Sequence, residues 1–187
     1  PRTPIGLGAY GADAMISLHS EHPRKKDYSE EYACLYHEKM VRMVSRCNFL
    51  YASFVWSMFD YATDNENAVI PGISQKGLVT YDSSIKKDPF FIYKAYWSEE
   101  PFVHLCGTRF AKRKKGNTKI KAYTNLSEPL SLYVNGKLIT TQKAKRHVFE
   151  AEVKLLVDSE IEIKCGSFSE KMMIHIADQK DNSYILK

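Results

Sequence analysis

The sequence predicts a chain in two parts: an α/β part made of two βα units, then an all-β part with the strand spacing of an immunoglobulin-like β-sandwich. Up to residue 98, apolar residues alternate between short continuous runs and the period of a helix, whereas after it they form only short segments between turn signals. The charge changes at the same place, because residues 1–98 carry 11 basic and 11 acidic side chains and residues 99–187 carry 16 and 11. We therefore expect domains at residues 1–98 and 99–187.

In the first part, the apolar run Ile5-Gly6-Leu7 predicts a short buried strand that ends in a glycine-rich turn. Residues 28–46 follow the helical period, with Asp27 or Ser29 as the expected cap. The stretch 49–59 is continuously apolar and aromatic, which is typical of a parallel strand buried on both faces. Residues 89–97 predict a second helix that begins with a proline behind Asp88.

In the second part, about seven short strands are expected in the 80 or so residues after residue 102, which is the density of a sandwich. The Asn135-Gly136 pair predicts a two-residue hairpin, because a type I′ turn needs positive φ at both central positions. The expected strands are Val103–Cys106, Thr118–Thr124, Leu130–Val134, Lys137–Thr141, His147–Val153, Ser159–Cys165 and Ser169–Ile176.

The composition is that of an ordinary globular protein, with 44% apolar and 26% charged residues, and it excludes collagen, a coiled coil and a wholly disordered chain. No stretch approaches the roughly 18–20 apolar residues of a membrane span, and no signal segment is visible, so we expect no membrane partner and can assign no compartment. The cysteines lack the spacing of metal ligands. We expect buried thiols at Cys34, Cys47, Cys106 and Cys165. We expect the chain to bind no metal and no cofactor.

Seven basic residues between Arg109 and Lys121 occur with no acid among them, a pattern that can attract phosphate or an acidic polymer. However, Gly116-Asn117 is a turn signal in their midst, and no aromatic residue is interleaved to stack on bases. We interpret the segment as a solvated strand, loop and strand, and expect no nucleic-acid partner.

Several segments, in order, resemble glycoside hydrolase family 2, of the β-galactosidase type. Residues 4–14 (PIGLGAYGADA), with His19 and residues 28–32, resemble the seventh strand and following helix of its (β/α)8 TIM barrel, and residues 54–61 (FVWSMFDY) the eighth strand. Residues 72–82 and 86–97 resemble the last barrel helix and its entry. Residues 121–125 and 132–137 resemble the immunoglobulin-like domain that follows. The resemblance implies a partial TIM-barrel end joined to this sandwich.

The resemblance also implies a retaining mechanism, in which two carboxylates about 5–5.5 Å apart act as nucleophile and acid/base. Where the family has a Ser-Glu pair before Tyr-Gly, this chain has Gly8 and Ala9. The acid/base comes from the fourth barrel strand as an Asn-Glu pair, which this chain lacks; Asn65-Glu66 has these residue types after the eighth strand, where we expect a loop role. The chain as it stands is therefore expected to be inactive.

Three residues are candidates for sugar binding. Trp56 matches a position that forms the floor of the family's sugar pocket, although a core role is equally compatible with its pattern. Asp60 and His19 either bond sugar hydroxyls or hold loops together, and the loop role is favoured. Tyr10 is expected to be structural.

The chain is thus expected to be the C-terminal piece of a β-galactosidase-like hydrolase, with a galactoside-type carbohydrate as partner. Two alternatives stay open: it is one piece of a working galactosidase whose rest is a separate chain, or the sandwich is a carbohydrate- or protein-binding module. Two parallel strands leave both sheet edges unpaired, so we also expect self-association or packing against the missing barrel part.

Overall fold

The computed structural model describes residues 3–64 and 70–177, in two compact units, Pro1–Phe90 and Phe91–Lys187. The division falls inside helix α2 (Asp88–Trp97) rather than after it. Within the described residues no helix is both long and apolar enough to cross a bilayer. The Asn65-Glu66 pair lies outside the described residues.

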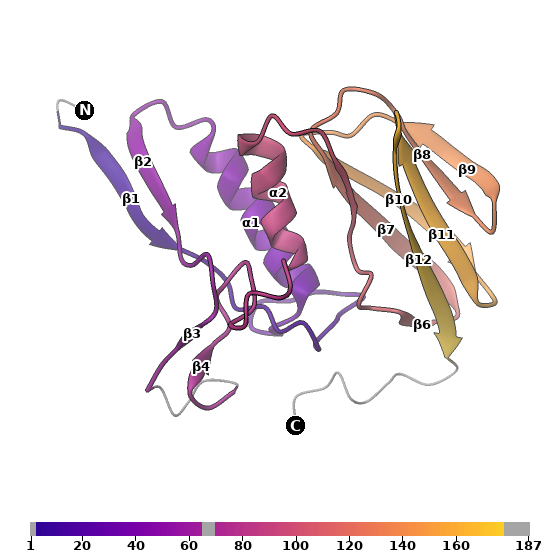
Figure 1. Ribbon diagram of the computed structural model, residues 1–187, viewed down its shortest axis with the longest axis horizontal. Coiled ribbons are helices and arrows are strands. Elements are labelled where there is room, and N and C mark those ends of the chain that lie inside the picture. Colours follow the sequence, from indigo (N-terminus) through magenta and orange to yellow (C-terminus); the bar gives the residue numbers. More distant parts are fainter. Residues whose placement is uncertain (1–2, 65–69, 178–187) are drawn as a thin grey trace. The chain divides into compact units, whose positions relative to one another are not determined.

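The first unit is built on two parallel strands, β1 (Ile5–Tyr10) and β2 (Leu50–Val55), joined through helix α1 (Glu30–Val44) (Figure 1). The strands pair from Ile5 opposite Leu50 to Tyr10 opposite Val55, with register shifts between. A short antiparallel hairpin follows, made of β3 (Tyr61–Ala62) and β4 (Ile73–Ser74). The expected order of strand, helix, strand, helix is present, with this hairpin as an addition that the sequence pattern did not indicate.

Helix α1 begins where its first polar residues can bond the free backbone N–H groups. Ser29 is the N-cap, and its hydroxyl accepts a hydrogen bond from the backbone N–H of Tyr32. Asp27, the other expected cap, instead accepts bonds from the backbone N–H and the hydroxyl of Ser29. Glu30 and Glu31 occupy the first turn and Arg42 the last, as the helix macrodipole favours. Ser29 therefore caps the helix, and Asp27 accepts hydrogen bonds from Ser29.

Strand β2 is not buried on both faces, which corrects the expectation from its apolar run. Within the described residues Tyr51 is 72% exposed and Phe54 58% exposed, and Phe49 and Phe59 are also exposed. A continuous apolar run needs neighbouring strands and helices to cover it. The described part of this chain supplies β1 as the only strand hydrogen-bonded to β2.

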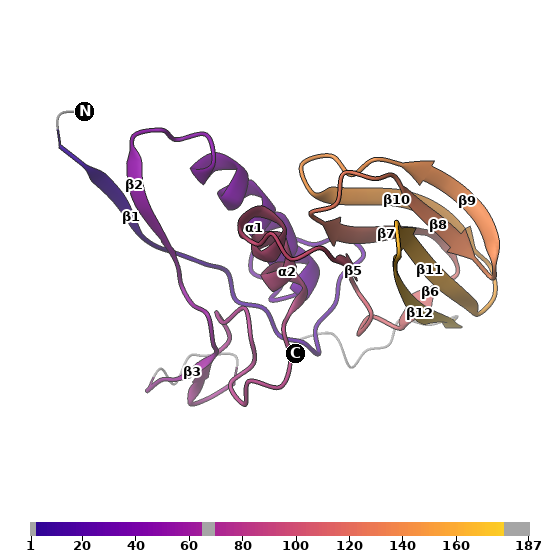
Figure 2. The ribbon, with the colours of Figure 1, turned by 45° about the horizontal axis from the view of Figure 1, so that its top comes forward.

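The second unit is a β-sandwich of two sheets lying face to face (Figure 2). One sheet has the strand order β10-β7-β5 and the other the order β6-β12-β11-β8-β9. Their bounds are β5 Val103–Leu105, β6 Lys112–Lys114, β7 Gly116–Thr124, β8 Leu130–Val134, β9 Lys137–Gln142, β10 Val148–Leu155, β11 Ser159–Cys165 and β12 Phe168–Ala177. The seven expected strands are all present, and β6 was missed.

The core of the sandwich takes alternate residues from both sheets. Ile120 and Phe149 come from the three-stranded sheet, and Leu132, Ile161 and Ile163 from the five-stranded one, all fully buried or nearly so. In β11 the intervening residues carry charged side chains on the other face. The sandwich therefore closes an apolar core with its own residues.

The expected hairpin joins β8 and β9, with Asn135 at φ 49° and Gly136 at φ 75° as the type I′ turn requires. The basic segment contains β6, which pairs in parallel with the end of β12. Its central Arg113 is buried, and its guanidinium donates to the carbonyls of Gly107, Phe110 and Lys119. That arginine is structural, not part of an exposed anion site.

None of the four cysteines, all of which lie in the described residues, forms a disulfide. Cys34, Cys106 and Cys165 are buried as expected, whereas Cys47, just after α1, is only partly buried.

Candidate functional site

The candidate site lies where β1 and β2 end together. The backbone N–H of Trp56 donates to the carbonyl of Tyr10 at 2.8 Å, which continues the parallel ladder one step beyond the paired strands. Trp56 therefore follows β2 at the place where Ala9 and Tyr10 end β1. A Cβ on Gly11 would lie 1.9 Å from the Trp56 carbonyl oxygen, so only glycine permits this close approach.

Ala9 is exposed at this end of β1 and offers only a methyl group. Its neighbour Tyr10 faces the opposite side of the strand and is buried. The Tyr10 hydroxyl has no hydrogen-bond partner among residues 3–64 and 70–177. Because neighbouring side chains of a strand face opposite sides, the Ala9 side chain is on the exposed side of β1 and the Tyr10 side chain is on the buried side.

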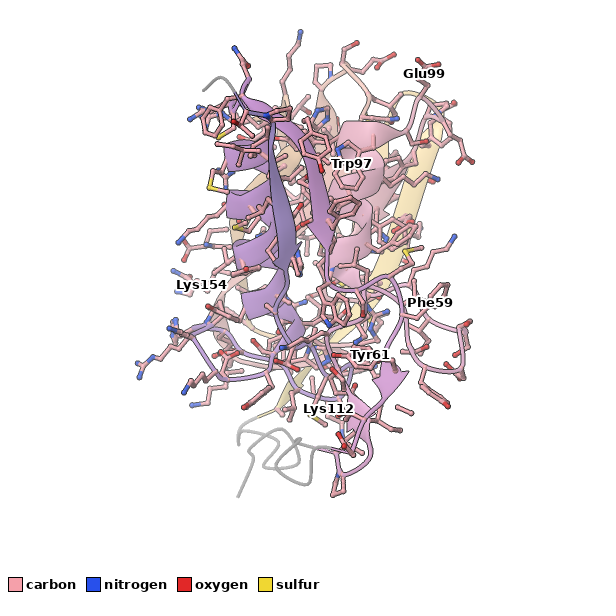
Figure 3. All side chains as sticks on the ribbon, turned by 90° about the vertical axis from the view of Figure 1, so that its left-hand side faces the viewer. Phe59, Tyr61, Trp97, Glu99, Lys112 and Lys154 are labelled. Carbon is pink, nitrogen blue, oxygen red and sulfur yellow. The ribbon has the colours of Figure 1, made fainter. Side chains whose placement is uncertain are left out.

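Trp56 is the main aromatic surface of the site, with half of its surface exposed. Its indole Nε1–H donates to the Tyr61 hydroxyl at 2.9 Å, and the two rings meet edge to face with centroids 5.8 Å apart. Phe59 and Tyr61 both lie in the stretch that runs from β2 into β3 (Figure 3). An exposed aromatic face of this kind suits the C–H surface of a sugar.

The backbone around Trp56 is bonded to the segment that follows β4. The N–H of Ser57 donates to the Lys76 carbonyl at 3.1 Å, and the Ser57 carbonyl accepts from the N–H of Leu78 at 3.0 Å. The pKa of the Tyr61 hydroxyl is lowered, chiefly by its hydrogen bond with Ser74, then by that with Trp56, and also by the positive charge of Lys76. The negative charge of Asp13 acts in the opposite direction and raises the pKa of this hydroxyl.

Below this surface lies a buried ion pair. The Lys87 ammonium donates to Asp60 Oδ1 at 2.8 Å, to the Ala14 carbonyl at 2.8 Å and to the Gln75 carbonyl at 3.2 Å. The same Asp60 oxygen accepts from the backbone N–H of Gly77 at 2.8 Å. Lys87 thus ties together three loops: the one after β1, the one after β2 and the one after β4.

Burial raises the pKa of the Asp60 carboxyl and lowers that of the Lys87 ammonium, because desolvation penalises both charged forms. The contact between the two groups opposes both shifts. The three acceptors around Lys87 favour the charged pair.

His19, the third candidate, bonds to the start of α1. Its Nδ1 lies 2.9 Å from Glu31 Oε1, and the other Glu31 oxygen accepts from the backbone N–H of Ser20. The His19 side chain is almost fully buried. These hydrogen bonds of His19 and Asp60 hold loops together, whereas Trp56 presents its side chain to solvent.

Sequence reasoning missed Lys87, Tyr61 and Lys76. Lys87 belongs to a Lys-Lys-Asp-Pro run that has the pattern of an exposed helix entry. Tyr61 is the last residue of the segment 54–61 that resembles the eighth strand. Its Trp-to-Tyr spacing of five residues matches no regular period, since a loop brings the two rings together. Around Ala9 and Trp56, the described residues offer no cluster of three metal-ligating side chains.

Comparisons with known proteins agree on one class of enzyme. No family model matches the chain. A β-glucuronidase of Bacteroides fragilis is 34% identical over 152 residues, which cover 77% of this chain and 22% of that protein. The β-galactosidase BoGH2A of Bacteroides ovatus is 24% identical over 101 residues, covering 54% of this chain and 12% of the relative.

A solved structure covers almost the whole chain. The crystal structure of an FMN-binding β-glucuronidase from Faecalibacterium prausnitzii L2-6 matches with a TM-score of 0.93 and 35% identity, over 98% of this chain and 29% of that one. The chain therefore spans less than a third of the length of the relatives that it matches.

Proposed function

Because this chain belongs to glycoside hydrolase family 2, we propose that it supplies the last two βα units of that family's catalytic barrel and the immunoglobulin-like sandwich that follows. The observation that carries the proposal is the parallel pair β1–β2, which brings Ala9 and Trp56 to the same end of the sheet. In barrel enzymes the site assembles at the carboxyl ends of the strands. Trp56 is the proposed sugar platform, and Asp60 and His19 hold the loops around it.

The proposed sugar class is a β-glucuronide rather than the galactoside that the sequence favoured. Relatives that are 34%, 32% and 30% identical are named β-glucuronidases or a putative β-glucuronidase. A β-galactosidase matches at 24% identity, and the solved structure of a putative β-galactosidase at 28%.

We propose that the chain alone does not hydrolyse glycosides. A retaining glycosidase needs a carboxylate that attacks the anomeric carbon and a second one that protonates the leaving oxygen. At the nucleophile position, by the resemblance, stands the methyl group of Ala9, which cannot form a glycosyl-enzyme intermediate. The acid/base is proposed to belong to barrel strands other than β1 and β2.

The test is complementation. The chain alone should hydrolyse aryl β-glucuronides and β-galactosides no faster than buffer, and Ala9→Glu alone should not change this. Mixed with the Bacteroides fragilis β-glucuronidase from which the matching region has been deleted, Ala9→Glu should give saturable turnover. The native chain and the Ala9→Gln control, which has the shape of glutamate without its charge, should give none.

Turnover by the native chain alone would overturn the proposal of inactivity. Turnover of Ala9→Glu without the partner would overturn the assignment of the acid/base to other strands. Equal turnover of Ala9→Gln and Ala9→Glu with the partner would show that Ala9 is not the nucleophile position.

The domain boundary between residues 98 and 99 is part of the same proposal. It places all of α2 with the barrel part, because α2 is the last helix before the period-two pattern begins. Limited proteolysis should release a stable all-β fragment that begins near Glu100. If both parts are degraded at one rate, the boundary is wrong.

A further inference from the structure

Trp56 is half exposed, yet its backbone and its side chain are each held by a hydrogen bond. Its backbone N–H bonds to the Tyr10 carbonyl, and its indole N–H bonds to the Tyr61 hydroxyl. An exposed tryptophan has only two side-chain torsions, and a ring hydrogen bond together with an edge-to-face contact restricts both. The orientation of this indole is therefore set by a residue five positions away.

Tyr61 is itself held by the small β3–β4 hairpin. It pairs with Ser74 across the two strands, and its hydroxyl also bonds to Ser74. The carbonyl of Lys76, just after β4, accepts from the backbone N–H of Ser57, next to Trp56. The hairpin thus bonds to the backbone after β2 through Lys76 and to the indole through Tyr61.

We propose that Tyr61 is a positioning residue, which fixes the indole of Trp56 so that its face, and not its N–H, is presented to the sugar. This rests on the proposed role of Trp56 as a sugar platform. The indole N–H is a donor only, and at 2.9 Å it is already committed to the Tyr61 oxygen. Recognition by Trp56 is then stacking on the C–H face of the sugar ring, without a hydrogen bond from the indole.

The chain carries only two tryptophans, Trp56 and Trp97, so the indole N–H signals of the whole chain can be assigned by one substitution, Trp97→Phe. Tyr61→Phe keeps the ring and removes only the acceptor oxygen. The matched control is Tyr81→Phe, which removes a hydroxyl from a tyrosine that is 58% exposed in the same unit.

In Tyr61→Phe the Trp56 indole proton should exchange with solvent roughly two- to tenfold faster, and its resonance should shift. The Trp97 signal and both signals of Tyr81→Phe should stay unchanged. An unchanged Trp56 signal in a Tyr61→Phe chain of native circular dichroism would overturn the proposal. If Tyr61→Phe lost the native circular dichroism spectrum, the native chain alone would decide. A Trp56 indole proton protected from solvent exchange there would support the proposal, and an unprotected one would overturn it.

A titration of the native chain with phenyl β-D-glucuronide tests the sugar role separately. The Trp56 indole signal should respond to the glycoside in the native chain, and the response should weaken several-fold in Tyr61→Phe. No response in the native chain would count against Trp56 as a sugar platform. The exchange rates of the indole proton would still test whether Tyr61 fixes the Trp56 side chain. An equal response in Tyr61→Phe would overturn the link between positioning and binding. In Trp56→Phe, the further change Tyr61→Phe should have no effect on binding.

Discussion

The two units of this chain treat their apolar strand residues in opposite ways. In the sandwich, Leu132, Ile161 and Ile163 are fully buried between two sheets of the same chain. In the parallel pair, Tyr51 and Phe54 of β2 are more than half exposed within the described residues. Both regions have strongly apolar strands, so the difference lies in what covers them.

The comparison shows that the pattern of apolar residues in a strand matches the number of its faces that are covered in the folded protein. The sandwich strands alternate apolar and charged residues, and the chain supplies the opposite sheet. The β2 run is apolar on both faces, which fits a strand with neighbours on both sides. The described neighbours leave it incomplete, in agreement with a chain that spans less than a third of its relatives.

The largest expected effect on the free energy of unfolding comes from the buried ion pair of Lys87 and Asp60. Lys87→Met should lower the free energy of unfolding by about 3–5 kcal/mol, because it leaves the buried Asp60 carboxylate without its cation. Urea unfolding followed by Trp56 fluorescence, in a Trp97→Phe background, measures the change. The double variant Lys87→Met/Asp60→Asn should regain part of the loss, since it removes the uncompensated charge. A loss below about 1 kcal/mol in Lys87→Met would show that the pair does not hold the loops.

The next effect separates the two apolar environments directly. Leu132→Ala should cost about 2–5 kcal/mol, because the cavity lies in a core closed by the chain itself. Phe54→Ala should cost less than about 0.5 kcal/mol, because the ring is already largely in water. Urea unfolding compares them: the β-sheet circular dichroism follows the sandwich, and Trp56 fluorescence in a Trp97→Phe background follows the first unit. Measured at a concentration where the chain is monomeric, similar losses at both positions would mean that β2 is covered within the chain itself, and the contrast would be wrong.

An acid-dependent loss of stability is expected from α1. Burial lowers the pKa of His37 from 6.5 to about 3, so between these values the unfolded chain binds a proton that the folded chain does not. Stability from this group is complete above about pH 6.5 and is lost as the pH falls. Between pH 7.5 and 4.5 the loss should be about 2–3 kcal/mol. His37→Gln should have a flatter pH profile than the native chain in urea unfolding, and parallel profiles would contradict the assignment.

The smallest effect on folding, and a larger one on assembly, is expected at the exposed face of β2. We propose that this face associates with a second copy or with the rest of a barrel, because its large aromatic side chains and open strand edges are otherwise in water. Phe54→Ser should leave the urea midpoint nearly unchanged and reduce both self-association in sedimentation at micromolar concentration and the binding of a hydrophobic dye. Ser53→Thr serves as a control on the same strand. A native chain that sediments as a monomer and binds no dye would contradict the proposal.

Local sequence determined most of the secondary structure. The helical stripe and the Asp27 and Ser29 pair located α1 within two residues, and Asn135-Gly136 located the β8–β9 turn. Alternation located the seven main sandwich strands, because a face that is either buried or wet leaves a period of two. Strand β6 was missed since its pattern, Lys112-Arg113-Lys114, has no apolar residue, and the buried member is an arginine bonded to three carbonyls.

The residues of the candidate site divide in the same way. The order of motifs along the chain predicted the family. The sugar-binding role of Trp56 and the assignment of Ala9 to the nucleophile position stay predictions. Only the tertiary structure revealed Lys87 in contact with Ala14, Asp60 and Gln75, residues 73, 27 and 12 positions away. It alone showed that Tyr61 accepts the Trp56 hydrogen bond and that β2 is exposed. Periodicity records whether a residue faces water or core, but contacts between loops depend on where the chain returns, which no local pattern encodes.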